Sequence, residues 1–240
     1  MFIPQSVELY IIITFVLLAF LKCCIVRQQR VFVPHCIHLW SGVLQISQHF
    51  IRVIFIGYNG RTYAFARERV YQMWYDDDLP QKASYLITEL FPGGPRSVSA
   101  ALTNSRSGVT TLIDRRTAYR FRWNRKHKRF QLARNTPQHF PPNITITPQT
   151  AFEWMDGNQI LLSGDKFVIY DAYWNMATFA GLTKRYFPKL PKDLLGIVYT
   201  GGSTMLMFTK RNTVKVYNVK KYRVLQEYPL KINEYFGCLL

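Results

Sequence analysis

Acidic residues are scarce in this sequence. Its 240 residues include 14 aspartates and glutamates against 31 lysines and arginines, which gives a formal net charge of +17 at pH 7. So large a surplus says little about the fold, but it favours an anionic partner such as a glycosaminoglycan, a nucleic acid or an acidic membrane. The alternative is a surplus scattered over the surface, with no dedicated ligand.

Sequence motifs that carry catalysis are also missing. The sequence has no H-E-x-x-H zinc-protease motif and no glycine-rich phosphate loop, since "PGGP" at 92–95 is flanked by prolines and does not open a helix. "GGSTM" at 201–205 resembles a serine nucleophile motif but ends in Met, inside a predicted hairpin turn. We therefore expect a protein that binds rather than an enzyme.

Cysteines are few, and they lie near the two ends of the chain: Cys23, Cys24, Cys36 and Cys238. The first pair directly follows an apolar run, while the second pair brackets nearly everything else. In an oxidising compartment an even pair favours a disulfide, and in the cytosol both residues would be buried free thiols.

The apolar run itself is short for a membrane span. "LYIIITFVLLAFL", residues 9–21, has 13 residues, whereas a spanning helix needs about 20. That length is typical of a signal-peptide core, so residues 1–30 are predicted to be a secretory leader with a short basic segment. The basic residues follow the run, which leaves open a retained anchor through residues 9–21. In a secreted chain, Asn143 of the "NIT" sequon is the predicted glycosylation site.

What the sequence does contain is an internal repeat. Phe-Pro pairs at 91–92, 140–141 and 187–188 are spaced 49 and 47 residues apart, and Tyr228-Pro229 continues the series. Turn-forming residues and alternating apolar residues recur between these pairs, so each unit is predicted to hold four short antiparallel strands. In the second unit these strands are "SAALT", "VTTLID", "TAYRFRW" and "RFQLA". "RTYAF" (61–65) aligns with "TAYRF" (117–121) in this scheme.

Four such units predict an all-β fold, a four-bladed β-propeller behind a hydrophobic leader, because a ring gives the apolar face of every sheet a partner. The propeller is expected over residues 31–240, with blades at about 36–92, 93–141, 142–188 and 189–238. A ring needs its first and last blades held together, and Cys36 and Cys238 bracket all four units.

The repeats resemble the hemopexin-like repeats, which form the four-bladed propeller of hemopexin, of vitronectin and of the carboxyl-terminal domain of matrix metalloproteinases. "FPGGP" (91–95) and "FPKLP" (187–191) are similar to the phrase that joins blades in that family, and the resemblance covers residues 36–238. It implies a disulfide between Cys36 and Cys238. Haem is not an expected ligand, because hemopexin uses two propellers with histidines between them.

The resemblance also implies a central channel that holds ions, lined by an Asp-Ala pair from each innermost strand. This sequence departs from that pattern, since Ser99, Thr150 and Leu195 stand near the places of the acids. A Ca²⁺ or other ion in the channel would then be held by main-chain oxygens near these three residues.

"RFRWNRKHKRF" at 120–130 is the strongest candidate for binding. Its first residues alternate basic and aromatic, which predicts a strand with one buried face, and a basic hairpin tip follows. With the preceding turn, the candidate polyanion site comprises Arg115, Arg116, Arg120, Arg122, Arg125, Lys126, Lys128 and Arg129. A glycosaminoglycan would bind there with release of counterions, as nucleic acids do. The alternative is a solvated edge strand whose charge prevents aggregation.

The sequence thus predicts a secreted, non-enzymatic hemopexin-like domain that binds matrix polyanions, a matrix protein or a protease through basic blade edges. Two alternatives stay open. One is the detached substrate-recognition domain of a matrix-metalloproteinase-like protein. The other, which we favour least, is a membrane-tethered or intracellular basic protein that binds nucleic acid.

Overall fold

The computed structural model describes residues 51–72 and 84–230. All the described residues belong to one compact unit of the chain. The leader, the anchor alternative at 9–21 and the disulfide predicted between Cys36 and Cys238 lie outside the described residues.

Four antiparallel sheets make up the described part, each with its strands in chain order apart from one extra short strand in the second. The first two sheets contain β1 (Ile51–Ile56), β2 (Thr62–Ala66), β3 (Arg69–Gln72), β4 (Ser84–Leu86), β5 (Ala100–Thr103), β6 (Val109–Asp114), β7 (Thr117–Asn124), β8 (Arg129–Leu132) and β9 (Gln138–His139), the last of which pairs with β7. The other two contain β10 (Thr150–Glu153), β11 (Gln159–Ser163), β12 (Lys166–Asp171), β13 (Met176–Leu182), β14 (Leu194–Gly201), β15 (Thr204–Thr209), β16 (Thr213–Asn218) and β17 (Arg223–Pro229).

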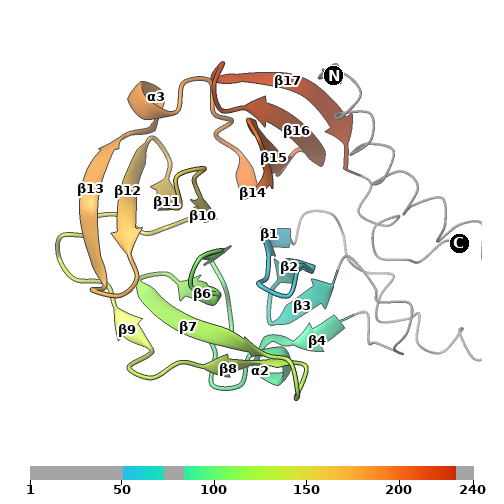
Figure 1. Ribbon diagram of the computed structural model, residues 1–240, viewed down its shortest axis with the longest axis vertical. Coiled ribbons are helices and arrows are strands. Elements are labelled where there is room, and N and C mark those ends of the chain that lie inside the picture. Colours follow the sequence, from blue (N-terminus) through green and yellow to red (C-terminus); the bar gives the residue numbers. More distant parts are fainter. Residues whose placement is uncertain (1–50, 73–83, 231–240) are drawn as a thin grey trace, which may run out of the picture. The chain divides into compact units, whose positions relative to one another are not determined.

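Within this unit the four sheets surround a common centre, with the first strand of each sheet innermost (Figure 1). The inner strands contact one another in a closed series, in which β1 neighbours β5, β5 neighbours β10, β10 neighbours β14, and β14 neighbours β1. The sheets are therefore four blades, numbered 1 to 4 in chain order, and the predicted all-β four-bladed propeller is confirmed. The exact boundaries between the blades, given above from the sequence, stay predictions.

One alignment made from the sequence is wrong. "RTYAF" falls mainly on β2, the second strand of blade 1, whereas "TAYRF" falls on β7, the third strand of blade 2. The third strand of blade 1 is β3, which has only four residues. A strand that short carries little alternation, so the longer neighbouring strand gave the stronger match.

Phenylalanines of the Phe-Pro pairs anchor the links between blades. Phe91 and Phe187 cap the C-terminal ends of the one-turn helices α2 (Ile87–Leu90) and α3 (Thr183–Tyr186), and their amides donate to the carbonyls of Ile87 and Thr183, both at 2.7 Å. Both phenylalanine side chains are buried, and so is that of Phe140 in the link from blade 2 to blade 3. The repeat therefore marks points where the chain crosses between blades and leaves an aromatic ring in the core.

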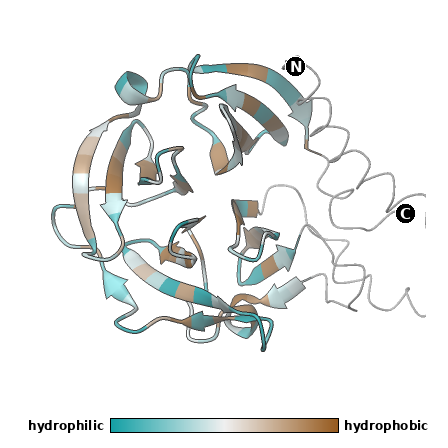
Figure 2. Cartoon of the chain, in the orientation of Figure 1, coloured by the Kyte–Doolittle hydropathy of each residue, from teal (hydrophilic) through white to brown (hydrophobic). Residues whose placement is uncertain are grey.

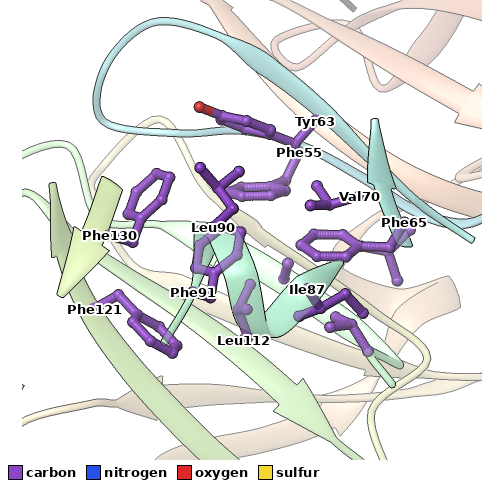
Figure 3. Close-up of a cluster of buried hydrophobic side chains, with 13 residues drawn as sticks. Phe55, Tyr63, Phe65, Val70, Ile87, Leu90, Phe91, Leu112, Phe121 and Phe130 are labelled. Atoms are coloured by element: carbon purple, nitrogen blue, oxygen red, sulfur yellow. The ribbon is translucent and has the colours of Figure 1, made fainter. Parts of the chain in front are cut away.

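Among the described residues, three apolar clusters are each shared by two successive blades. Apolar and polar residues alternate along many strands, so each sheet contributes an apolar face to these clusters (Figure 2). The first cluster is rich in aromatic rings, and Phe91 stacks on Phe130 at 4.4 Å between ring centroids and meets Phe121 edge-on at 5.2 Å (Figure 3). Each such ring stabilises the fold by about 1.5–3 kcal/mol through burial.

Backbone packing closes the ring between the last blade and the first. A β-carbon placed on Gly196 of β14 would lie 1.8 Å from the carbonyl oxygen of Ile54 on β1. No side chain fits there, so glycine is required for the close approach of the two strands. A similar contact joins blades 3 and 4, where the buried Thr150 hydroxyl donates to the carbonyl of Leu194 at 3.0 Å.

Candidate polyanion-binding site

The structure divides the predicted basic site between two ends of one strand. Arg115 and Arg116 form the turn before β7, and residues 125–128 form the turn after it. An eight-residue strand is about 25 Å long, at roughly 3.3 Å per residue. The two turns therefore lie on opposite sides of the blade, and the eight predicted side chains do not form one cluster.

Arg116 is engaged in holding the link between blades 2 and 3. Its guanidinium donates to the carbonyls of Ile144 at 2.8 Å and Ile146 at 3.0 Å, with longer bonds to those of Phe140 and Pro141. The side chain is half-buried. Its donors satisfy main-chain carbonyls of this link, those of Ile144 and Ile146 above all, so this arginine has a structural role.

Arg120 is engaged in the same way at the seam between blades 2 and 3. Its guanidinium donates to the carbonyl of Ala172, to the carbonyl of Asn135 at 2.9 Å and to Oε1 of Gln138 at 2.8 Å. Charge-assisted bonds of this kind are stronger than neutral ones. The side chain is therefore committed to blade 3 and the β9 segment.

Five exposed cations remain together at the other end of β7, and we call them the blade-2 cluster: Arg122, Arg125, Lys126, Lys128 and Arg129. Arg122 donates to the carbonyl of Ser107 in the neighbouring turn at 3.0 Å. The turn is held by Asn124, whose Oδ1 accepts the amide of His127 at 3.0 Å. Beneath it Trp123 is half-buried, with its ring 4.9 Å from that of Phe130. The cluster thus rests on an ordered aromatic base.

No carboxylate lies near the blade-2 cluster in the sequence. Asp114 and Glu153 are consecutive acidic residues, and the 38 residues between them include nine lysines and arginines. In blade 4, Arg211 meets Asp193 at 3.3 Å and Lys215 meets Glu227 at 3.2 Å. The charge of blade 4 is thus partly neutralised, and that of the blade-2 cluster is not.

The residues predicted near a channel ion do not fit a tightly held divalent cation. Ser99 donates to the carbonyl of Ile113 at 3.1 Å, Thr150 is bonded to blade 4, and the Leu195 side chain is buried and apolar. The four inner strands carry one carboxylate, Glu153, which accepts bonds from Ser105. Among the described residues no three His, Cys, Asp or Glu side chains gather as a metal site. An ion held by main-chain oxygens alone stays a prediction.

Asn143, the predicted glycosylation site, is exposed on the link between β9 and β10. Its side-chain amide donates to the carbonyl of Ala177 on β13 at 3.4 Å. Thr145 of the sequon is exposed as well, while Ile144 between them is buried. The sequon is therefore accessible, and its use stays a prediction.

Sequence reasoning missed an aromatic pair at the tip of blade 3. Tyr173 and Trp174 lie in the turn 172–175 between β12 and β13, with side chains 79% and 70% exposed and rings 4.9 Å apart. We call residues 172–175 the aromatic turn. The available signal was two consecutive aromatic residues between predicted strands, since a tight turn cannot bury both.

In the part of the chain that the structure describes, every helix is too short to cross a membrane.

Comparisons with known proteins agree with this architecture. No family model matches the sequence. Matrix metalloproteinase-C of Caenorhabditis elegans is 35% identical over 133 residues, which are 55% of this chain and 23% of that protein. The match therefore spans about a quarter of the relative's length.

Solved plant seed proteins share the fold. The hemopexin fold protein CP4 from cow pea has a TM-score of 0.60 at 12% identity and covers 78% of this chain and 95% of its own. A plant lectin with two metal-binding sites from Cicer arietinum has a TM-score of 0.58 at 10% identity, with coverage of 78% and 95%. The seed albumin LS24 from Lathyrus sativus has a TM-score of 0.56 at 9% identity, with coverage of 78% and 94%. The blades, their order and these likenesses together show that the described residues have the four-bladed β-propeller of the hemopexin fold.

Proposed function

We propose that this chain is a non-catalytic binding domain of an extracellular protein, and that the blade-2 cluster binds a sulfated glycosaminoglycan. One observation carries the proposal. Five exposed lysines and arginines share one hairpin end within a 38-residue stretch that contains no acidic residue. The relative named as a matrix metalloproteinase supports an extracellular setting.

Sulfate groups suit this cluster chemically. The guanidinium of arginine presents paired donors to two oxygens at once, and three members of the cluster are arginines. Binding of a densely charged chain releases its condensed counterions, which favours association at low salt. Because the turn is held by Asn124 and rests on Trp123 and Phe130, little order has to be gained on binding.

The test is chromatography on immobilised heparin with a salt gradient. Replacing Arg125, Lys126, Lys128 and Arg129 together by glutamine should lower the salt concentration of elution. By analogy with nucleic acids, the slope of log affinity against log salt should shrink by about 3 for four lost contacts.

A matched control removes the same charge from scattered, exposed positions. Lys166, Lys184, Lys192 and Lys210 are all exposed and belong to other blades or links, and their joint replacement by glutamine should shift elution much less. Equal shifts in the two quadruple variants would show that only total charge matters, and the proposed site would be wrong. Duplex DNA as a competitor tests the nucleic-acid alternative.

A second candidate is the substrate-recognition part of a matrix-metalloproteinase-like protein. The 35% identity over 133 residues favours it. It predicts a longer transcript that encodes an H-E-x-x-H segment, or a native protein well above the 28.2 kDa of this chain. A native protein of 28.2 kDa or less, in cells that make no longer transcript with that segment, would exclude it. Intact mass with and without reduction would also test the leader and the disulfide.

A further inference from the structure

The outer edge of blade 3 is unusual for a protein in water. β13 is the last strand of its sheet, and its seven residues include no charged side chain. Met176, Phe179 and Leu182 are 40%, 40% and 53% exposed. The outermost strand of blade 4, β17, carries Arg223 and Glu227 instead. Natural proteins blunt exposed edges with charge or cover them, so β13 needs a cover.

The backbone of the adjoining aromatic turn is held by hydrogen bonds, although its rings are exposed. Oδ1 of Asp171 accepts the amides of Tyr173 at 2.8 Å and Trp174 at 3.1 Å. Asn175 accepts the hydroxyl of Tyr170 at 2.9 Å and donates to the carbonyl of His139 at 2.8 Å. The backbone that carries the two rings is therefore fixed, and the exposed rings can pack against a cover.

The predicted glycosylation site lies beside this edge. The amide nitrogen of Asn143 is 3.4 Å from the carbonyl oxygen of Ala177, near the start of β13. Ala177 follows Trp174 by three residues. The link after β9 runs beside the first part of β13 (Figure 1), so a group attached to Asn143 would emerge at the apolar edge.

We propose that an N-linked glycan on Asn143 covers the start of β13 and the aromatic turn. In its attachment the amide nitrogen bonds to the anomeric carbon of a lipid-diphosphate-linked oligosaccharide. The bond from that carbon to the diphosphate oxygen breaks, and one amide proton is lost to solvent. A primary amide has two N–H donors, so one remains for the carbonyl of Ala177. This bond would orient the first sugar along the strand.

A glycan suits the edge better than a second copy of this chain. Two copies each carry a net charge of +17 and repel one another at low salt. A sugar chain adds no positive charge to the surface, and it is bulky and solubilising. The inference rests on the extracellular location in the proposed function, because glycans are added in the secretory pathway.

The experiment uses the full chain secreted from glycosylating cells. T145A destroys the sequon and keeps the Asn143 side chain, whereas the matched control T145S keeps the sequon and its glycan. Acrylamide quenching of Trp174 is obtained by subtracting the signal of the W174F counterpart of each protein. We expect a mass loss on enzymatic glycan removal for the parent and T145S. We also expect roughly twofold stronger Trp174 quenching in T145A, because a bulky surface glycan shields the ring.

Two results would overturn the inference. One is an unchanged mass after glycan removal from the secreted parent. The other is a glycan whose loss leaves Trp174 quenching unaltered. The salt concentration for elution from heparin should be the same for T145A and T145S, because the blade-2 cluster lies at the far end of β7. The glycan proposal and the polyanion proposal can therefore fail separately.

Discussion

Blade 2 and blade 3 share one arrangement of strands but differ in the exposed residues of their outer hairpins. Each has four antiparallel strands in chain order and borders a one-turn helix followed by a buried phenylalanine, α2 with Phe91 before blade 2 and α3 with Phe187 after blade 3. The outer hairpin of blade 2 carries five exposed cations, whereas that of blade 3 carries two exposed aromatic rings and an uncharged last strand. The buried faces of the strands thus determine the fold of each blade, whereas the exposed residues of the outer hairpins differ. This is expected if function is carried by sites placed on a common fold.

The shared frame of the two blades can be tested at the link phenylalanines. Phe91 contacts the rings of Phe121 and Phe130, and Phe187 contacts those of Trp154 and Phe167. F91A and F187A should each lower the free energy of unfolding by about 3–5 kcal/mol, because a buried ring leaves a cavity. Urea denaturation measures both. A cost below about 1 kcal/mol at either position would show that the two blades do not share this frame.

The interfaces of blade 2 with blade 1 and with blade 3 can be compared at alkaline pH. Burial raises the pKa of Tyr63 and that of Tyr170 to about 12. Their neutral forms therefore stabilise the fold fully below about pH 10, and this contribution is lost as pH rises towards 12. Each loss is up to about 2.7 kcal/mol, at 1.36 kcal/mol per pH unit between the two pKa values.

Tyr170 can be separated from other groups that titrate in this range. Y170F should be less stable than the parent at pH 8 by about 1 kcal/mol, because the hydroxyl bond to Asn175 is lost. Between pH 10 and 12 this difference should vanish or reverse, since only the parent buries a group that must ionise. Urea midpoints across the range measure it. A constant difference would mean that Tyr170 does not titrate with the fold.

The smallest expected effect distinguishes Arg116 from Arg125, both of which were predicted from the sequence to belong to the same binding site. R116M leaves the carbonyls of Ile144 and Ile146 without their donor and should cost about 1–3 kcal/mol. R125M removes an exposed side chain and should change stability by no more than about 0.5 kcal/mol. Elution from heparin should shift in the opposite order, with an effect for R125M alone. If R116M and R125M had equal effects on stability and on elution, the distinction between structural and binding arginines would be wrong.

The ring of blades could be predicted because its signals are local and repeated. Each Phe-Pro pair marks a crossing, and alternation along "VTTLID" and "TAYRFRW" marks strands that the structure places at β6 and β7. The roles of Arg116 and Arg120 could not be predicted. Their partners are carbonyls 15 to 52 residues away, and a sequence shows the charge but not the acceptor.

The separation of the predicted basic residues into two groups could have been predicted, because the sequence shows that a strand lies between them. Turns before and after an eight-residue strand must lie at its opposite ends. Gly196 is different, because its requirement comes from a carbonyl on β1. No local pattern distinguishes it from a glycine in a weak strand.

The close approach of Gly196 to β1 has a consequence for how the chain folds during its synthesis. Ile54 and Gly196 are 142 positions apart, so a ribosome making the chain releases blade 1 long before its final neighbour exists. The first sheet must wait for three more to emerge, and contacts so distant along the chain form slowly. The contact between β1 and β14 therefore becomes possible only after synthesis has reached blade 4, and a nascent chain that stops before residue 196 cannot close the ring of blades.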